Sequence, residues 1–363
     1  MKKILLTALF LIMNTALFAK SNDIWIAFEN EDADLIGYKD KNGVIKIEPK
    51  FIVGAGKFEN IMAVVEETYD NKWNSYYLTK TGKTAGKDSL YYFDNNPDCE
   101  SEGFIRFRDH KTDKAGMLNK DGDIVIPAEY SDLTRVRNGM IIALKDAVKK
   151  YSGEHYTWTG GQELLIDTSN NILIDNFPYD DNLNFFSIKK TKTPHSDPIR
   201  KSFLARDGYY WSFIDFKKEF KNWLTNDLLV NLTRKKLLNA SHNTIVWEYG
   251  TWDSTEYLRG ENSRAEFINN NFEILKAGLL EILDPNYDYF ISRDSLNTLI
   301  YEAGFEKYFN NCGEFKDWIY PVMTIVISHT NGNDFTQNFY EFLRTDKGYK
   351  LISAAIRNAN LRI

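Results

Sequence analysis

Cysteine is scarce in this chain, because its 363 residues include only Cys99 and Cys312. Two cysteines cannot form a disulfide scaffold or a cysteine-rich metal site, so the fold must depend on an apolar core. A dominant charge is also missing, since 45 lysines and arginines stand against 51 acidic residues. This balance argues against nucleic acid or an anionic membrane as the main partner.

The standard catalytic motifs are absent as well. The chain has no Gly-x-Ser-x-Gly motif, no glycine-rich phosphate loop and no His-Glu-x-x-His motif. Its five histidines are scattered along the chain, which disfavours a zinc site. The sequence therefore predicts no catalytic residues, no cofactor and no metal, and it favours a protein that is not an enzyme.

Apolar residues are plentiful, at 43% of the chain, and 15% of the residues are aromatic. This composition is typical of a folded protein and not of a disordered one. The length is sufficient for two domains of about 100–200 residues each.

Residues 1–19 have the pattern of a secretory signal peptide. Lys2 and Lys3 precede an apolar run over residues 4–18, and Ala19 supplies the small residue expected before a cleavage site. The run is shorter than the roughly 20 apolar residues that a membrane span needs. No cysteine follows it directly, which disfavours a lipid anchor. We therefore expect a periplasmic or secreted protein without stable membrane insertion after cleavage.

An exported location permits a disulfide, but the two cysteines are far apart in the sequence. They fall in different expected domains. Two separate thiols are therefore the expectation, and a bridge between Cys99 and Cys312 is the alternative.

Four segments share a turn signature, in which an oxygen-bearing residue precedes glycine or asparagine by three positions. The pairs are Asp40 and Gly43, Thr79 and Gly82, Asn119 and Gly122, and Asp167 and Asn170. The first residue of each pair can accept hydrogen bonds from backbone amides, and the second tolerates positive φ. Alternating isoleucines after two of the turns indicate half-buried strands. The pattern predicts an array of β units over residues 22–190, in which neighbouring units must bury each other's apolar faces.

Two of these segments resemble WG repeats. Residues 37–51 and 115–130 each contain the turn, an apolar strand, a proline and an aromatic residue, although Ile36-Gly37 and Ala115-Gly116 stand where a Trp-Gly pair would be. The resemblance implies a bacterial, exported β-repeat scaffold that presents surfaces for interaction. It implies no catalytic residues.

Residues 191–198 contain two prolines and no apolar residue, and we expect them to link the array to a second domain at 199–363. Helical spacing predicts helices over residues 212–226, 263–283 and 294–310. Alternation predicts strands at 322–328, 335–344 and 349–355, joined as an antiparallel meander. The fold class expected for this half is α+β. Residues 340–351 are similar to the last hairpin of NTF2-like and SnoaL-like domains, which implies a curved sheet around a pocket.

The candidate binding residues are clustered in one short segment, at Trp247, Glu248, Tyr249, Trp252 and Asp253. Aromatic rings beside carboxylates are typical of carbohydrate sites, and apolar surroundings raise the pKa of an acid. Aromatic residues also simply fill cores, so core packing is the alternative interpretation.

Three functions remain open. The first is a non-catalytic, exported binding or scaffold protein whose partner is another protein or a cell-envelope glycan. The second is an envelope hydrolase that acts on carbohydrate or peptide through a carboxylate pair in the C-terminal domain. The third is a secreted effector. Replacing Glu248 or Asp253 should abolish turnover by a hydrolase, whereas binding spread over a surface should tolerate either change.

Overall fold

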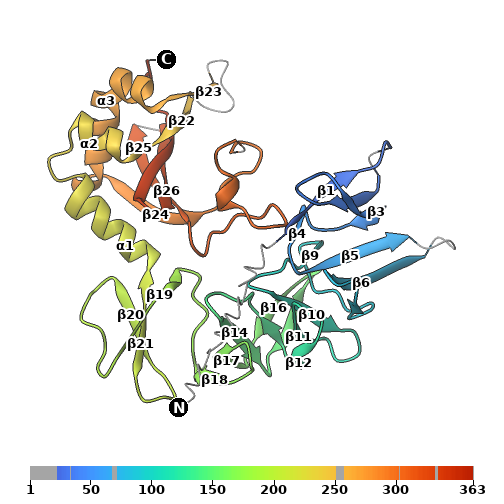
Figure 1. Cartoon of the computed structure of the whole chain (residues 1–363). Helices are drawn as coiled ribbons and strands as arrows, with labels where there is room; N and C mark the ends of the chain where they lie inside the picture. Colours follow the sequence, from blue (N-terminus) through green and yellow to red (C-terminus); the bar gives the residue numbers. More distant parts are fainter. Residues whose placement is uncertain are drawn as a thin grey trace, which may run out of the picture.

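The computed structural model describes residues 23–32, 34–67, 72–250, 257–301, 303–331 and 334–362. The expected signal peptide lies outside the described residues. Antiparallel β-sheets follow one another from Trp25 to Asp215, and a helix-covered, six-stranded sheet forms most of the described remainder (Figure 1). The chain is therefore mostly β, with a few helices in its C-terminal part.

The first sheet has seven strands in the order β4-β1-β2-β3-β5-β6-β7. Its strands are β1 (Trp25–Glu29), β2 (Ile36–Lys39), β3 (Ile45–Val53), β4 (Lys57–Phe58), β5 (Ile61–Glu67), β6 (Trp73–Thr79) and β7 (Thr84–Ala85). Two short strands follow, β8 (Tyr92–Phe93) and β9 (Asn96–Pro97), which pair as a hairpin.

Smaller sheets follow, and we call the run of sheets from Trp25 to Asp215 the array. One contains β10 (Phe104–Asp109), β11 (Lys114–Asn119) and β12 (Ile124–Tyr130), and the next contains β13 (Asp132–Leu133), β14 (Met140–Lys145), β17 (Gln162–Asp167) and β18 (Ile172–Ile174). The hairpin of β15 (Val148–Ser152) and β16 (His155–Thr159) is inserted between β14 and β17. The last sheet has the order β19-β21-β20, with β19 (Leu183–Thr191), β20 (Arg200–Leu204) and β21 (Tyr210–Asp215).

The four turns named from the sequence have the same backbone hydrogen bonds. In each, the amide of the first residue donates to the carbonyl four residues later, and the amide of the glycine or asparagine donates back to the first residue's carbonyl. The left-handed position has φ of +81° at Gly43, +86° at Gly82, +72° at Gly122 and +65° at Asn170. The side chains of Asp40, Asn119 and Asp167 each accept from the amides two and four residues later.

The same turn occurs twice more, at Ala205–Tyr209 and at Asn310–Glu314. Gly208 and Gly313 take the left-handed position there, with φ of +80° and +78°. In the second of these turns, Asn310 Oδ1 accepts from the amides of Cys312 and Glu314. The motif of the array therefore recurs deep in the C-terminal half of the chain.

The expected linker at residues 191–198 does not separate two domains. Thr191 ends β19, and the residues after it connect β19 to β20 within one sheet. The prolines lie in a connection between strands, which suits a residue that cannot donate a backbone hydrogen bond to a sheet. The β-sheets run on to Asp215, where the helical part begins.

The helix expected over residues 212–226 begins later than predicted. Residues 212–215 belong to β21, and Asp215 caps α1 (Phe216–Trp223) by accepting from the amide of Lys218 at 3.1 Å. The helix continues as a π-helical turn, Leu224–Leu228, and is followed by α2 (Arg234–Asn239). Phe213 thus packs within the β-sheets, whereas Phe216 and Phe220 lie in the helical core.

The C-terminal sheet has the order β23-β22-β27-β26-β25-β24. Its strands are β22 (Ser241–Tyr249), β23 (Leu258–Ser263), β24 (Asp288–Asp294), β25 (Val322–Asn331), β26 (Asp334–Thr345) and β27 (Gly348–Ile356). Strands β22 and β27 pair in parallel, and the other neighbours pair antiparallel. The meander expected over residues 322–355 is confirmed as β25, β26 and β27.

The second expected helix is confirmed as α3 (Arg264–Leu280), which continues as a 3₁₀ turn, Glu281–Leu283. Ser263 caps it by accepting from the amide of Glu266. The prediction of a third helix over residues 294–310 is wrong. Beyond the end of β24, the described part of this segment is irregular except for a short 3₁₀ turn, Glu306–Tyr308. Its aromatic residues pack on the sheet and do not form a stripe along a helix.

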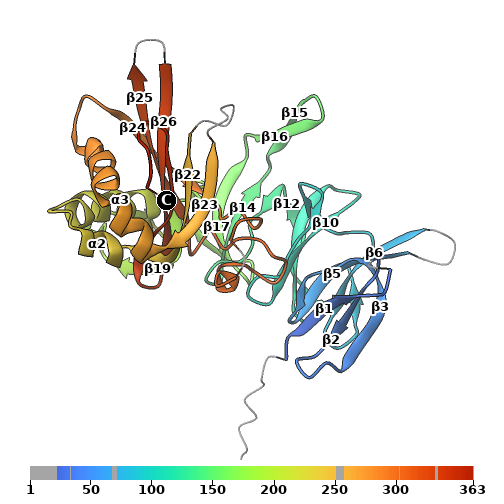
Figure 2. The ribbon, with the colours of Figure 1, turned by 90° about the horizontal axis from the view of Figure 1, so that it is seen from above.

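The two faces of the C-terminal sheet are covered differently. Helices α1, α2 and α3 pack on one face, and Figure 2 shows α2 and α3 on the same side of the strands. The other face carries buried side chains of the segment 295–321, which connects β24 to β25. Among these are Leu296, Tyr301, Phe305 and Tyr308, which pack with Val246 and other sheet residues.

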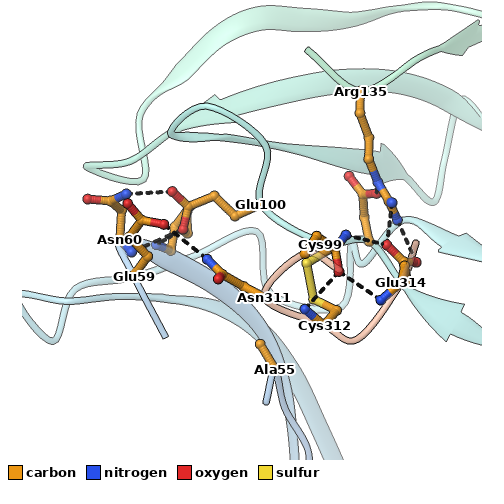
Figure 3. Close-up of a disulfide and its surroundings, with 12 residues drawn as sticks. Ala55, Glu59, Asn60, Cys99, Glu100, Arg135, Asn311, Cys312 and Glu314 are labelled. Atoms are coloured by element: carbon orange, nitrogen blue, oxygen red, sulfur yellow. Dashed lines mark hydrogen bonds and ion pairs between the residues drawn. A yellow bond between two sulfur atoms is a disulfide. The ribbon is translucent and has the colours of Figure 1, made fainter. Parts of the chain in front are cut away.

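A disulfide between Cys99 and Cys312 joins the array to the segment 295–321 (Figure 3). The expectation of two separate thiols is therefore wrong. The turn at Asn310–Glu314 carries Cys312 to the array, so that the two Cα atoms lie 6.1 Å apart although 213 residues separate them. Asn311 adds two contacts in the same place, because its carbonyl accepts from the amide of Lys57 and its side chain donates to Glu59.

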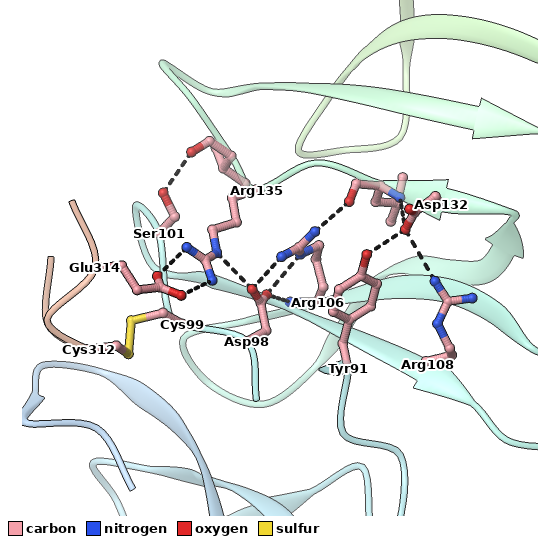
Figure 4. A network of polar contacts seen from close by, with 12 residues as sticks. Tyr91, Asp98, Cys99, Ser101, Arg106, Arg108, Asp132, Arg135, Cys312 and Glu314 are labelled. Atoms are coloured by element: carbon pink, nitrogen blue, oxygen red, sulfur yellow. Dashed lines mark hydrogen bonds and ion pairs between the residues drawn. A yellow bond between two sulfur atoms is a disulfide. The ribbon is translucent and has the colours of Figure 1, made fainter. Parts of the chain in front are cut away.

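Ion pairs reinforce this junction (Figure 4). The guanidinium of Arg135 binds both oxygens of the Glu314 carboxylate and also donates to Asp98 Oδ1 at 2.8 Å. Arg106 donates to both oxygens of the fully buried Asp98. Burial alone would raise the pKa of Asp98, but the charges of Arg106 and Arg135 outweigh it and hold that pKa well below its ordinary value.

Replacing a glycine that has positive φ should lower the free energy of unfolding more than replacing a glycine in an ordinary conformation. Gly43→Ala is expected to lower the free energy of unfolding by about 1–2 kcal/mol, because the added Cβ meets no neighbour but φ is +81°. Gly56→Ala is the matched control, since its Cβ would make an ordinary 3.5 Å contact and φ is not positive. Urea unfolding of both variants measures the difference, and equal stabilities would contradict the role of the turn.

The disulfide should stabilise the oxidised chain substantially. Replacing Cys99 and Cys312 together by serine is expected to cost about 2–4 kcal/mol, because the bridge closes a long loop of the unfolded chain. Thermal unfolding with and without a reducing agent provides the measurement. The wild-type melting temperature should fall to that of the double variant on reduction, while the variant should not respond. Two free thiols in the denatured, unreduced wild-type protein would exclude the bridge.

Candidate functional site

A cavity of about 490 Å³ lies on the face of the C-terminal sheet that the helices do not cover. Strands β22, β23, β26 and β27 form its floor, and Ile300 and Tyr301 contribute from the segment 295–321. Its charged and hydroxyl-bearing side chains include Glu248, Glu341, Arg259, Arg357, Tyr301 and Ser353. Cavities of this size are typical of small-ligand sites.

Strand register explains why these side chains meet. Residues directly opposite each other in a pair of strands point to the same face of the sheet. Glu248 is opposite Arg259 on β23, and Glu341 is opposite Ser353 on β27. Alternation along β22 sends the neighbouring Trp247 to the helix-covered face, where its Nε1 donates to Asn262 at 2.6 Å.

Glu248 is held between two arginines. Its Oε2 accepts from Arg357 Nη2 at 3.0 Å, and its Oε1 lies 4.0 Å from Arg259 Nε. Arg357 also donates to the carbonyl of Gly250, and its guanidinium lies over the ring of Tyr257 at 5.7 Å. These contacts hold the carboxylate at the wall of the cavity.

Glu341 has a different environment from Glu248. Burial raises the pKa of Glu341, and the negative charges of Asp294 and Glu248 raise it further. Hydrogen bonds from Ser353 and Tyr301 oppose these effects without cancelling them. Burial also raises the pKa of Tyr301, which therefore remains a hydroxyl. The cavity thus contains one carboxyl group that binds protons unusually well and one that is paired with guanidinium groups.

The cavity combines balanced charges with aromatic surface. The lining contains two carboxyl groups and two guanidinium groups, and hydroxyl and amide groups of Ser353, Thr336 and Gln337 add further donors and acceptors. Phe335, which is 62% exposed, and Phe339 supply aromatic rings. A ligand that fits this lining would have many hydroxyl or amide groups, apolar faces and no large net charge.

The structure distributes the predicted binding residues over separate places. Glu248 lies in the cavity, whereas Trp247 belongs to the core on the other face. Tyr249 donates from its hydroxyl to Asn360 at 2.8 Å. Trp252 and Asp253 lie outside the described residues. Trp247 and Glu248 are neighbours in the sequence, but their side chains lie on opposite faces of the sheet.

Sequence reasoning missed Glu341, Arg259, Arg357 and Tyr301. The one available sign was a charged residue between Tyr340 and Phe342, inside an apolar strand. Arg259 and Arg357 depend on the pairing of strands that the sequence did not reveal, namely β22 with β23 and with β27. Tyr301 depends on how the segment 295–321 packs on the sheet.

The helix-covered face is filled with side chains. Phe220 and Trp223 of α1 pack against Phe342 and Tyr349, with ring centroids 4.9–5.6 Å apart. The cavity therefore lies on the opposite side of the sheet from the helices.

Comparison with known proteins identifies no relative: no family model, no curated protein and no solved structure matches the chain. Among the described residues, no helix has the length and apolarity needed to cross a bilayer. Within the same residues, no three acidic, histidine or cysteine side chains are arranged to hold a metal ion.

The raised pKa of Glu341 should appear in the pH dependence of stability. Its contribution to stability is fully present below the unfolded pKa, about 4.5, and is lost as pH rises through the folded pKa. Glu341→Gln removes this loss, so its melting temperature should rise relative to that of the wild-type protein as the pH increases from 4 to 8. Glu261→Gln, at an exposed position of β23, is the control and should show no such trend. Parallel curves for all three proteins would exclude a raised pKa.

Proposed function

We propose that the protein is an exported, non-catalytic binding protein whose C-terminal cavity takes a glycan of the cell envelope. The observation that carries this proposal is the lining of the cavity. Two carboxyl and two guanidinium groups line it, and aromatic rings lie beside them. Sugars present both hydroxyl groups and apolar ring faces, and they match such a surface better than a strongly charged ligand does.

The β-sheets of residues 25–215 act as the scaffold in this proposal. Their recurring turns support a relationship to WG repeats. The C-terminal part supports a relationship to NTF2-like domains through its helices and its sheet order, β23-β22-β27-β26-β25-β24. Both relationships are part of the proposal, and neither contributes a catalytic residue.

Hydrolysis of the bound glycan is the second candidate function. Glycoside hydrolysis commonly uses one protonated and one ionised carboxyl group. Glu341, with its raised pKa, suits the proton donor, and Glu248, which accepts a hydrogen bond from Arg357, is the second carboxyl group of the pair. This pair differs from the Glu248 and Asp253 pair named from the sequence.

Filling the cavity should abolish binding. Ala355 lies on its floor, so Ala355→Phe is expected to weaken the affinity for β-1,4-linked N-acetylglucosamine oligomers by at least about tenfold. Isothermal titration calorimetry measures the affinity, and melting curves establish that the variant is folded. Leu299→Phe is the control, because Leu299 is 88% exposed and does not line the cavity.

Product analysis of the same mixtures separates the two functions. Intact oligomers after long incubation support binding alone, whereas cleavage that Glu341→Gln abolishes supports the hydrolase. If the wild-type protein binds no oligomer, or if Ala355→Phe binds as tightly as the wild-type protein, the proposed site is wrong.

A further inference from the structure

A second cavity adjoins the first. It measures about 480 Å³ and is lined by Gly56 and Lys57 of the array, together with residues between Thr298 and Gly313. Tyr301 lines both cavities. Tyr301 is therefore common to the linings of the two cavities, and the second cavity reaches from the segment 295–321 to β4.

The second cavity repeats the chemical character of the first. Its lining includes one cation, Lys57, and one anion, Glu306, together with Asn310 and Asn311, whose side-chain amides donate to Glu314 and Glu59. Phe309 supplies an aromatic ring. Hydrogen bonding by the amide of Gly304 lowers the pKa of Glu306, so this residue is ionised and can balance Lys57. A ligand without net charge suits both cavities.

The contacts at the junction between the array and the segment 295–321 fix the position of the second cavity relative to the first. Lys57 donates its backbone amide to the carbonyl of Asn311 at 2.9 Å, and the neighbouring Cys312 is bonded to Cys99. Arg135 binds Glu314 in the same turn. The wall of the second cavity is thus fixed to the array, while Tyr301 of the same segment is packed against the sheet.

We propose that the two cavities form one elongated site for a linear, uncharged oligosaccharide, which crosses Tyr301 and contacts both the C-terminal sheet and the array. This inference rests on the proposed function of the first cavity and adds the chain length of the ligand. Sugar units in the first cavity meet Glu248 and Glu341, and those beyond Tyr301 meet Lys57 and Glu306. Neither the array nor the C-terminal sheet contains the whole site.

Binding should therefore depend on the length of the oligomer. We expect the affinity of the wild-type protein for the β-1,4-linked N-acetylglucosamine hexamer to exceed that for the dimer by about tenfold or more, because only the hexamer occupies both cavities. Ala303→Trp places an indole in the second cavity. It should reduce the affinity for the hexamer to that for the dimer and leave the affinity for the dimer unchanged. Leu299→Phe is again the control and should retain the dependence on length.

The possible results separate this inference from the proposed function. If the dimer binds and the hexamer binds no better, or if Ala303→Trp leaves the hexamer affinity unchanged or increased, the elongated site is wrong while the first cavity keeps its function. If neither oligomer binds, both proposals are wrong. An alanine hexapeptide is tested alongside, and tighter binding of this peptide than of the hexasaccharide would overturn the assignment to sugars.

Discussion

One turn, Asn310–Glu314, joins the C-terminal part of this protein to the array through a disulfide, hydrogen bonds and an ion pair. Three residues of this turn contact the array. Asn311 forms hydrogen bonds through its side-chain amide and its backbone carbonyl, Cys312 forms the disulfide, and the carboxylate of Glu314 forms an ion pair. The buried carboxylate of Asp98 is part of the same network, because it orients Arg135 toward Glu314. A buried ion pair of this kind is costly to break, since a charge left without its partner remains in a place from which water is excluded.

The cavity on the C-terminal sheet follows from how the two faces of that sheet are used. Large aromatic and aliphatic side chains from three helices occupy one face completely. The other face is closed only in part by the segment 295–321, and polar residues of β22, β26 and β27 remain accessible beside it. The carboxyl groups of Glu248 and Glu341 lie on the same face, yet their neighbours differ. Arginines surround the first, and hydroxyl groups and other acids surround the second.

Local features of the chain were predictable from the sequence, and long-range features were not. The turns at Asp40, Thr79, Asn119 and Asp167 could be named because their hydrogen bonds join residues no more than four positions apart. The cap at Ser263 and the meander from Val322 onward are local in the same sense. The expected helix at residues 294–310 is absent because contacts with a distant sheet outweigh the helical spacing of its apolar residues. The cavity depends on strand pairing between β22 and β27, which are about a hundred positions apart, so only Glu248 was named in advance.

The disulfide has a consequence for the order in which the chain matures. Cys99 is synthesised 213 residues before the only other cysteine in the sequence. Throughout that interval its thiol has no intramolecular partner, and any earlier oxidation would have to involve another molecule. In the finished fold, Cys99 is 2% exposed. The disulfide of Cys99 can therefore form only after Cys312, in the last third of the protein, has been synthesised. A chain shortened before residue 312 would leave the thiol of Cys99 without an intramolecular partner.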